Sequence, residues 1–129
     1  MRTWTDPQKE AITARNASIL VSAAAGSGKT SVLIERLMAL LRGGASVERM
    51  LVVTFTRAAA GDMRERLMEA LGKEARGNKH LRQQYQALNG ADIGTLHQFC
   101  GSLIKRHFQA VGADPAAKTA DDSRTKPLL

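Results

Sequence analysis

The residues with the clearest chemistry run from Ala23 to Thr30, where the sequence reads AAAGSGKT. Gly26 and Gly28 allow backbone turns that other residues rarely adopt, so successive amide N–H groups can line one concavity. The Lys29 ammonium can neutralise the β- and γ-phosphates of a nucleoside triphosphate, and the Thr30 hydroxyl is a ligand that Mg²⁺ accepts. The pattern therefore predicts a phosphate-binding loop for ATP and Mg²⁺, with Lys29 and Thr30 as its catalytic residues.

The flanking elements agree with this interpretation. The apolar segment 18–22 predicts a buried strand before the loop, and the pattern of residues 28–41 predicts a helix after it, ended by Gly43 and Gly44. The positive end of that helix dipole adds to the anion site. A glycine-containing turn that binds nothing is the weaker alternative. The expected nucleotide contacts are Ala23, Ala24, Ala25, Gly26, Ser27, Gly28, Lys29, Thr30 and Ser31.

A second group of candidate residues follows the apolar segment 50–53, which predicts a buried parallel strand. The group comprises Thr54, Phe55, Thr56 and Arg57, at the strand end where doubly wound sheets gather their ligands. Hydroxyls can bond phosphates, and an aromatic face can stack a base of single-stranded DNA. The alternative, with Phe55 in the core and Thr56 only capping a helix, is equally compatible with the residues alone.

A third strand is predicted at 91–94, and it ends at Thr95 with His97 two residues on. Thr95 is expected to cap an amphipathic helix, and His97 would then lie in its first turn, within reach of a phosphate. A plain surface histidine is the alternative for His97. The apolar stripe expected on that helix, with Cys100 in the core, consists of Leu96, Phe99, Cys100, Leu103, Ile104, Phe108 and Val111.

Gln8 lies on a short predicted helix over residues 5–15, with Thr5 or Asp6 as its cap. A side-chain amide can both donate to and accept from adenine, so Gln8 could select ATP. From the residues alone, an ordinary solvated glutamine is the favoured interpretation.

The remaining pattern predicts a helix from about residue 57, with Ala59, Met63, Leu67 and Leu71 on one face. A polar linker at 72–79, a weaker helix at 81–88 and a turn at 89–90 follow. Strand and helix alternation predicts an α/β fold with a parallel sheet. Three strands make a thin sheet, which suggests the opening part of a larger nucleotide-binding domain.

Composition narrows the function classes. The 129 residues carry 19 Lys and Arg against 12 Asp and Glu, a net charge of +7 that favours polyanionic partners. No apolar run approaches the roughly 20 residues of a membrane helix, so no membrane partner is expected. A single cysteine argues against a disulfide framework and for a reducing compartment, the cytoplasm.

ATP hydrolysis in phosphate-loop enzymes also needs an apolar strand that ends in Asp, usually with Glu. The sequence shows no such element, because Asp121 and Asp122 follow a segment that is not a buried strand. Binding is therefore predicted, and complete hydrolysis is not.

Taken in order, Gln8, the loop 23–30, the segment 53–59 and the segment 94–100 resemble the N-terminal part of UvrD/Rep-type superfamily 1 helicases. The segment TLHQFC at 95–100 and the Ala-Asp-Asp at 120–122 are similar to the AddA component of AddAB helicase–nucleases. The resemblance covers about residues 3–122 and implies a RecA-like motor domain. It also implies that Gln8 contacts adenine.

The resemblance further implies an ATP-dependent 3′→5′ DNA helicase that acts on single-stranded DNA in double-strand break repair, with an AddB-like partner subunit. Thr54, Phe55, Thr56, Thr95 and His97 match its DNA motifs, whereas Arg57 stands where the family often has Asn. Residues 1–111 would form part of the ATP-binding domain and 112–129 a loose tail. The family's acidic Mg²⁺ motif, arginine motifs and nuclease would lie beyond Leu129, so the isolated chain is expected to be inactive. A non-catalytic module that binds nucleotide or DNA, and a small phosphate-loop kinase, are the alternatives.

Overall fold

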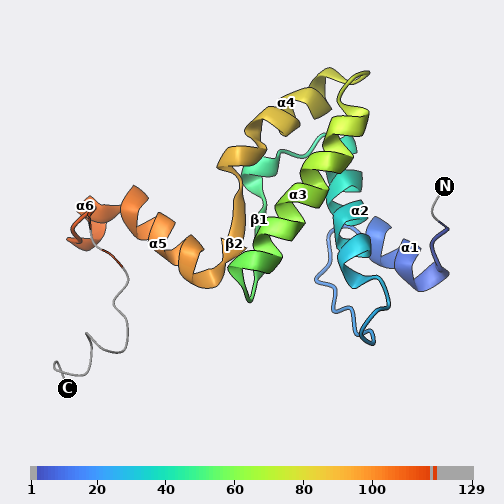
Figure 1. Cartoon of the computed structure of the whole chain (residues 1–129), viewed down its shortest axis with the longest axis horizontal. Coiled ribbons are helices and arrows are strands. Elements are labelled where there is room, and N and C mark those ends of the chain that lie inside the picture. Colours follow the sequence, from blue (N-terminus) through green and yellow to red (C-terminus); the bar gives the residue numbers. More distant parts are fainter. Residues whose placement is uncertain (1–2, 117, 119–129) are drawn as a thin grey trace.

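The computed structural model describes residues 3–116 and 118 of the chain. In the described part, six α-helices, two 3-10 turns and two strands follow one another along the chain (Figure 1). They are α1 (Asp6–Thr13), α2 (Lys29–Arg42), η1 (Val47–Arg49), β1 (Leu51–Thr54), α3 (Arg57–Glu74), α4 (Lys79–Ala87), η2 (Leu88–Gly90), β2 (Asp92–Thr95), α5 (Leu96–Arg106) and α6 (Phe108–Val111).

The two strands pair in parallel, with Leu51 opposite Asp92 and Thr54 opposite Thr95. α3 makes the crossover between them and packs on both strands, as a parallel connection requires. The α/β class with a parallel sheet and flanking helices is confirmed. Because both strands end at the same edge, the segments that follow them start side by side.

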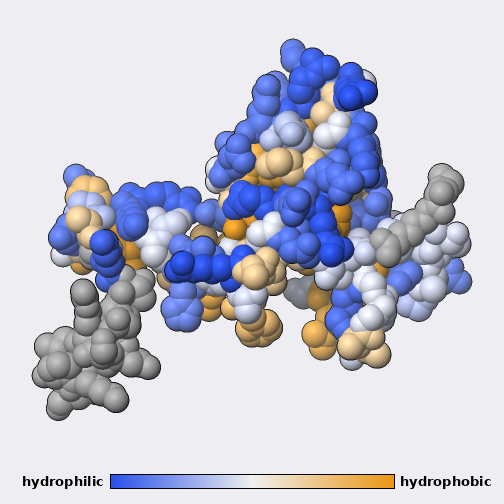
Figure 2. All heavy atoms as spheres, in the orientation of Figure 1, coloured by the Kyte–Doolittle hydropathy of each residue, from blue (hydrophilic) through white to orange (hydrophobic). Residues whose placement is uncertain are grey.

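The core lies where α2, α3 and α4 meet the sheet. α2, α3 and α4 stand together in Figure 1, and their outer faces are mostly hydrophilic in Figure 2. Leucines from all three helices, with Met38 and Val47, are among its most deeply buried side chains. The buried members of this core are Leu37, Met38, Leu41, Val47, Val52, Met63, Leu67, Leu71, Leu81, Leu88, Ala91 and Ile93.

The strand expected at 18–22 is not formed. This segment is extended but belongs to no strand, and the sheet of the described residues has two members instead of three. Leu20 is 95% exposed, and Ile19 and Val21 are also exposed. A strand needs a neighbour to bond its N–H and C=O groups, and the hydrogen-bonded ladder of the described residues joins only β1 and β2.

Burial at the other two predicted apolar segments is also lower than expected. In β1 only Val52 is buried, because Leu51 and Val53 point to the face that no helix covers. α5 follows its predicted position, yet none of its residues is buried and Cys100 is exposed. α5 extends away from α2–α4, on the side opposite α1 (Figure 1), so its apolar stripe has no surface beneath it.

Smaller differences concern helix faces and boundaries. Ala60, rather than Ala59, joins the buried face of α3. α3 also continues through Gly72 to Glu74, into the range expected to form the polar linker. Among the described residues, none of the helices has the length and apolarity to cross a membrane. Asp121 and Asp122 lie outside the described residues.

Candidate nucleotide and nucleic-acid site

The loop before α2 has the backbone that its glycines predict. Gly26 has a φ of 77° and Gly28 a φ of 82°, both in the left-handed region that glycine adopts without strain. Gly28 is also the N-cap of α2, so the helix begins directly at Lys29. The free N–H groups of the first turn of α2 and its positive dipole end therefore lie at the loop.

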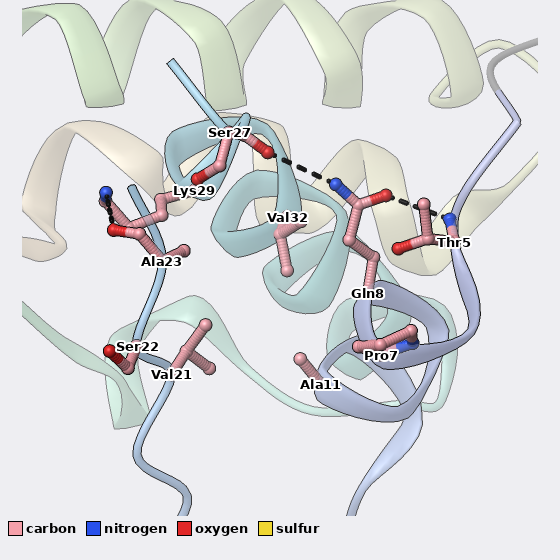
Figure 3. Close-up of a pocket in the computed structure, with 10 residues that line it drawn as sticks. All are labelled: Thr5, Pro7, Gln8, Ala11, Val21, Ser22, Ala23, Ser27, Lys29 and Val32. Atoms are coloured by element: carbon pink, nitrogen blue, oxygen red, sulfur yellow. Dashed lines mark hydrogen bonds between the residues drawn. The ribbon is translucent and has the colours of Figure 1, made fainter. Parts of the chain in front are cut away.

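Lys29 curls back over the loop from the first turn of α2. Its Nζ donates hydrogen bonds to the carbonyl oxygens of Ala23 at 2.6 Å and Ala24 at 2.8 Å. Figure 3 shows the side chain directed toward Ala23. The ammonium is thus held beside the turn, and two backbone oxygens occupy the donors that a phosphate would use.

Gln8 reaches the same loop from α1, nineteen residues earlier in the chain. Its Nε2 donates to the carbonyl oxygen of Ser27 at 3.2 Å, and its Oε1 accepts from the backbone N–H of Thr5 at 3.0 Å (Figure 3). The interpretation of Gln8 as a merely solvated residue is wrong, because its amide joins the start of α1 to the loop.

A hollow of about 220 Å³ lies between α1, the loop and α2. Its walls combine the Gln8 amide and the Lys29 stem with mainly apolar groups, a composition that suits a flat ring beside a polar head. The lining residues are Thr5, Pro7, Gln8, Ala11, Val21, Ser22, Ala23, Ser27, Lys29 and Val32 (Figure 3).

The hollow gathers only part of the predicted nucleotide site. Gln8, Ala23, Ser27 and Lys29 line it, whereas Thr30 is exposed in the first turn of α2. The other predicted residues outside the lining are Ala24, Ala25, Gly26, Gly28 and Ser31. Sequence reasoning missed Thr5, Pro7, Ala11, Val21, Ser22 and Val32, for which the only sequence signal was their nearness to Gln8 or to the loop.

The first predicted DNA segment forms a turn between β1 and α3. Thr54 Oγ1 donates to the carbonyl oxygen of Thr56 at 2.9 Å, and Thr56 Oγ1 accepts from the N–H of Ala59 at 3.1 Å. Thr56 is therefore the N-cap of α3. The Phe55 side chain is fully exposed, which excludes it from the core, and Arg57 is exposed at the first position of α3.

The second predicted DNA segment lies beside the first. Thr95 is the register partner of Thr54, and its Oγ1 accepts from the N–H of Gln98 at 3.2 Å as the N-cap of α5. His97 is exposed in the first turn of that helix. Two helix N-termini and an exposed aromatic ring thus share one edge, which presents donors for phosphates and a face for a base.

Arg64, which sequence reasoning missed, ties α3 to the β2 side of this edge. Its guanidinium donates to the carbonyl oxygens of Leu88 at 2.6 Å, Ala91 at 3.2 Å and Ile93 at 3.0 Å. These three contacts fix the start of β2 against the helix that begins at the first DNA segment. No sequence signal marked Arg64, because its partners are backbone carbonyls.

Comparison with known proteins agrees with this arrangement. Residues 4–129 match the family model of the UvrD/REP helicase N-terminal domain. The chain is 53% identical over 123 residues to the AddA-type polypeptide of the ATP-dependent helicase/nuclease of Heliobacterium modesticaldum, a match that covers 93% of this chain and 9% of that protein. It is 49% identical over 130 residues to the protein of the same name in Syntrophomonas wolfei, where the match covers 98% of this chain and 10% of that protein.

The chain spans about a tenth of the length of these two relatives. The likeness extends over the loop, Gln8 and both strand ends, because the matched family region begins at residue 4 and includes all of them. The chain therefore belongs to the UvrD/REP helicase N-terminal domain family, and resembles the AddA type of helicase/nuclease polypeptide within it.

Proposed function

We propose that the loop 23–30 binds the triphosphate of ATP with Mg²⁺, as the ATP-binding part of an ATP-dependent DNA helicase. The observation that supports this most directly is the meeting of Lys29 and Gln8 at one hollow, from two helices. Lys29 would exchange the carbonyls of Ala23 and Ala24 for phosphate oxygens. The Gln8 amide would turn from Ser27 toward adenine, with the apolar wall of the hollow against the ring.

Thr30 would contribute its hydroxyl to Mg²⁺, the ion that bridges and neutralises phosphate oxygens when it is bound. The first turn of α2 supports this role, since Thr30 follows Lys29 directly and is exposed. The remaining ligands would be phosphate oxygens and water, because Mg²⁺ is usually held with few protein groups.

We further propose that the edge formed by the ends of β1 and β2 binds single-stranded DNA. The hydroxyls of Thr56 and Thr95 accept backbone N–H groups through a lone pair, so each O–H stays available to donate to a phosphate. Phe55 would stack a base, and His97 and Arg57 would contribute further phosphate contacts.

At the level of the whole protein, the names of the relatives combine helicase and nuclease. We propose that a full-length protein of this type translocates 3′→5′ on single-stranded DNA in double-strand break repair, together with an AddB-like partner. The chain of 129 residues would bind ATP without appreciable turnover, because its sequence offers no apolar strand that ends in Asp and Glu.

Titration of the chain with a fluorescent ATP analogue and Mg²⁺ tests the nucleotide site. Lys29→Met should weaken binding by about 10- to 100-fold, since contacts to a charged group contribute about 1.5–3 kcal/mol. Lys73→Met is the matched control, because Lys73 is an exposed lysine on α3 that pairs with Glu69 at 2.7 Å, away from the hollow. Equal affinities of wild type and Lys29→Met, or no saturable binding by folded wild type, would refute the assignment.

Fluorescence anisotropy with a labelled oligothymidine tests the DNA edge. Phe55→Ala should weaken binding because stacking contributes about 1–3 kcal/mol per base. Leu20→Ala, another exposed apolar side chain, should leave the affinity unchanged. DNA affinity that responds to ATP supports the helicase assignment, whereas salt-sensitive binding that ignores ATP would favour a non-catalytic binding module.

A further inference from the structure

The residue that seats the base-reading helix on the phosphate-loop helix is Arg36. It lies in α2, two turns after Lys29. Its Nη1 donates to the carbonyl oxygens of Ala11 at 2.6 Å and Ala14 at 2.9 Å, at the C-terminal end of α1. The last carbonyls of a helix have no partner within the helix and carry its negative dipole end, so a guanidinium there is well placed.

The apolar contact between α1 and α2 is small. Its buried members are Ala11, Ile12 and Val32, with Trp4 and Ala39 packed against them. The two helices are separated in the chain by an exposed extended segment at 18–22, which does not itself fix their relative position. Polar ties therefore carry much of the orientation of α1.

Two such ties hold α1 at opposite ends. Near its N-terminus, Gln8 bonds the Ser27 carbonyl of the loop, and at its C-terminus Arg36 bonds Ala11 and Ala14. An adenine that engages the Gln8 amide would replace the first tie. The Arg36 contacts would then keep Gln8 at the correct distance from Lys29, since Arg36 and Lys29 share one rigid helix.

We infer that Arg36 is a positioning residue for base selection at the ATP site. It does not line the hollow, so it acts on the nucleotide only through the placement of α1 and Gln8. The inference rests on the proposed ATP function of the loop. It predicts that Arg36 matters for the adenine end of the ligand and not for the phosphate end.

The experiment compares Mg·ATP, Mg·GTP and inorganic tripolyphosphate with Mg²⁺ as ligands of the whole chain. Arg36→Ala should lower ATP affinity by about tenfold and reduce the preference of ATP over GTP, because charge-assisted hydrogen bonds at α1 are lost. Tripolyphosphate affinity should stay within about twofold of wild type, since the loop and Lys29 are intact.

Arg15→Ala is the matched control. Arg15 also donates to the Ala14 carbonyl, at 3.0 Å, and to that of Ile12 at 2.9 Å, but from the same segment and without reaching α2. It should leave ATP selectivity unchanged. Trp4, the single tryptophan of the sequence, reports the seating of α1, and its emission should shift to the red in Arg36→Ala and not in Arg15→Ala.

Parallel loss of ATP and tripolyphosphate affinity in Arg36→Ala, or an equal loss of selectivity in Arg15→Ala, would overturn the inference. If Arg36→Ala fails to fold, Arg36→Gln keeps a neutral donor and should show a smaller loss confined to ATP, and wild-type selectivity in that variant would also overturn it. Wild type that binds tripolyphosphate without preferring ATP over GTP overturns the role of Arg36 alone. Wild type that binds neither ligand refutes the proposed function itself.

Discussion

Replacement of Gly28 by alanine tests the left-handed geometry on which the loop depends. Gly28 has φ 82° and ψ 21°, and a Cβ built there would meet Nε2 of Gln8 at 3.8 Å, an ordinary contact. The cost of Gly28→Ala therefore comes from the backbone and not from a clash. A residue with a Cβ in the left-handed region costs about 1–2 kcal/mol, so the free energy of unfolding should fall by about that amount.

Gly61→Ala adds the same methyl group in α3 and should have the opposite effect. A Cβ at Gly61 would meet nothing within 4 Å, and alanine in a helix interior is favoured over glycine by about 1 kcal/mol. The two variants should therefore differ in stability by about 2–3 kcal/mol, a large part of the total for a domain of this size.

Urea denaturation followed by far-UV circular dichroism gives the unfolding free energies of both variants and of wild type. The binding titration gives a second readout, because relief of strain at residue 28 would turn its N–H away from the phosphates. Gly28→Ala should weaken ATP binding and Gly61→Ala should not. If both variants shift stability in the same direction, the left-handed conformation of Gly28 is not what the loop requires, and the reasoning fails.

Three further variants test other parts of the structure. Gln84→Leu should destabilise the fold by about 1–3 kcal/mol in urea denaturation, because it leaves the buried N–H of Val47, which Gln84 Oε1 accepts at 2.8 Å, without a partner. The hydrogen bond from Arg42 lowers the pKa of Glu74 from its usual 4.5. The contribution of Glu74 is therefore present above that value and lost as pH falls through the lowered pKa, so the stability deficit of Glu74→Gln at neutral pH should vanish in acid. Leu20→Asn should change the unfolding free energy by less than about 0.5 kcal/mol, since Leu20 is exposed, and a larger loss would restore the buried strand that the sequence suggested.

Features set by neighbouring residues could be predicted from the sequence. The caps Thr56 and Thr95 bond N–H groups three residues ahead, and the pair of Asp62 and Arg66, at 3.0 Å, lies one helical turn apart. The left-handed glycines of the loop follow from residue type alone. Such contacts need no knowledge of the rest of the chain, which is why the loop and the helix starts were placed correctly.

Burial was predicted less well, because an apolar pattern identifies a face without identifying what covers it. The α5 stripe and the segment 18–22 have the periodicity and apolarity of covered elements, yet both are exposed in the described structure. Helix α3 shows the converse case, since its apolar face meets α2, α4 and both strands and is buried. Pattern strength is similar in these elements, so the difference comes from the presence of an opposing surface.

The residues that position the site were the least predictable, and the reason lies in their partners. Arg36, Arg64 and Gln8 all bond backbone carbonyl oxygens of distant segments. Every residue has a carbonyl, so the partner leaves no mark in the sequence, unlike a carboxylate one turn away. Groups proposed to touch the ligand show themselves by type and spacing, whereas groups that hold them in place are visible only once the chain is folded. The base-reading role of Gln8 thus depends on a side chain, that of Arg36, which no motif identifies.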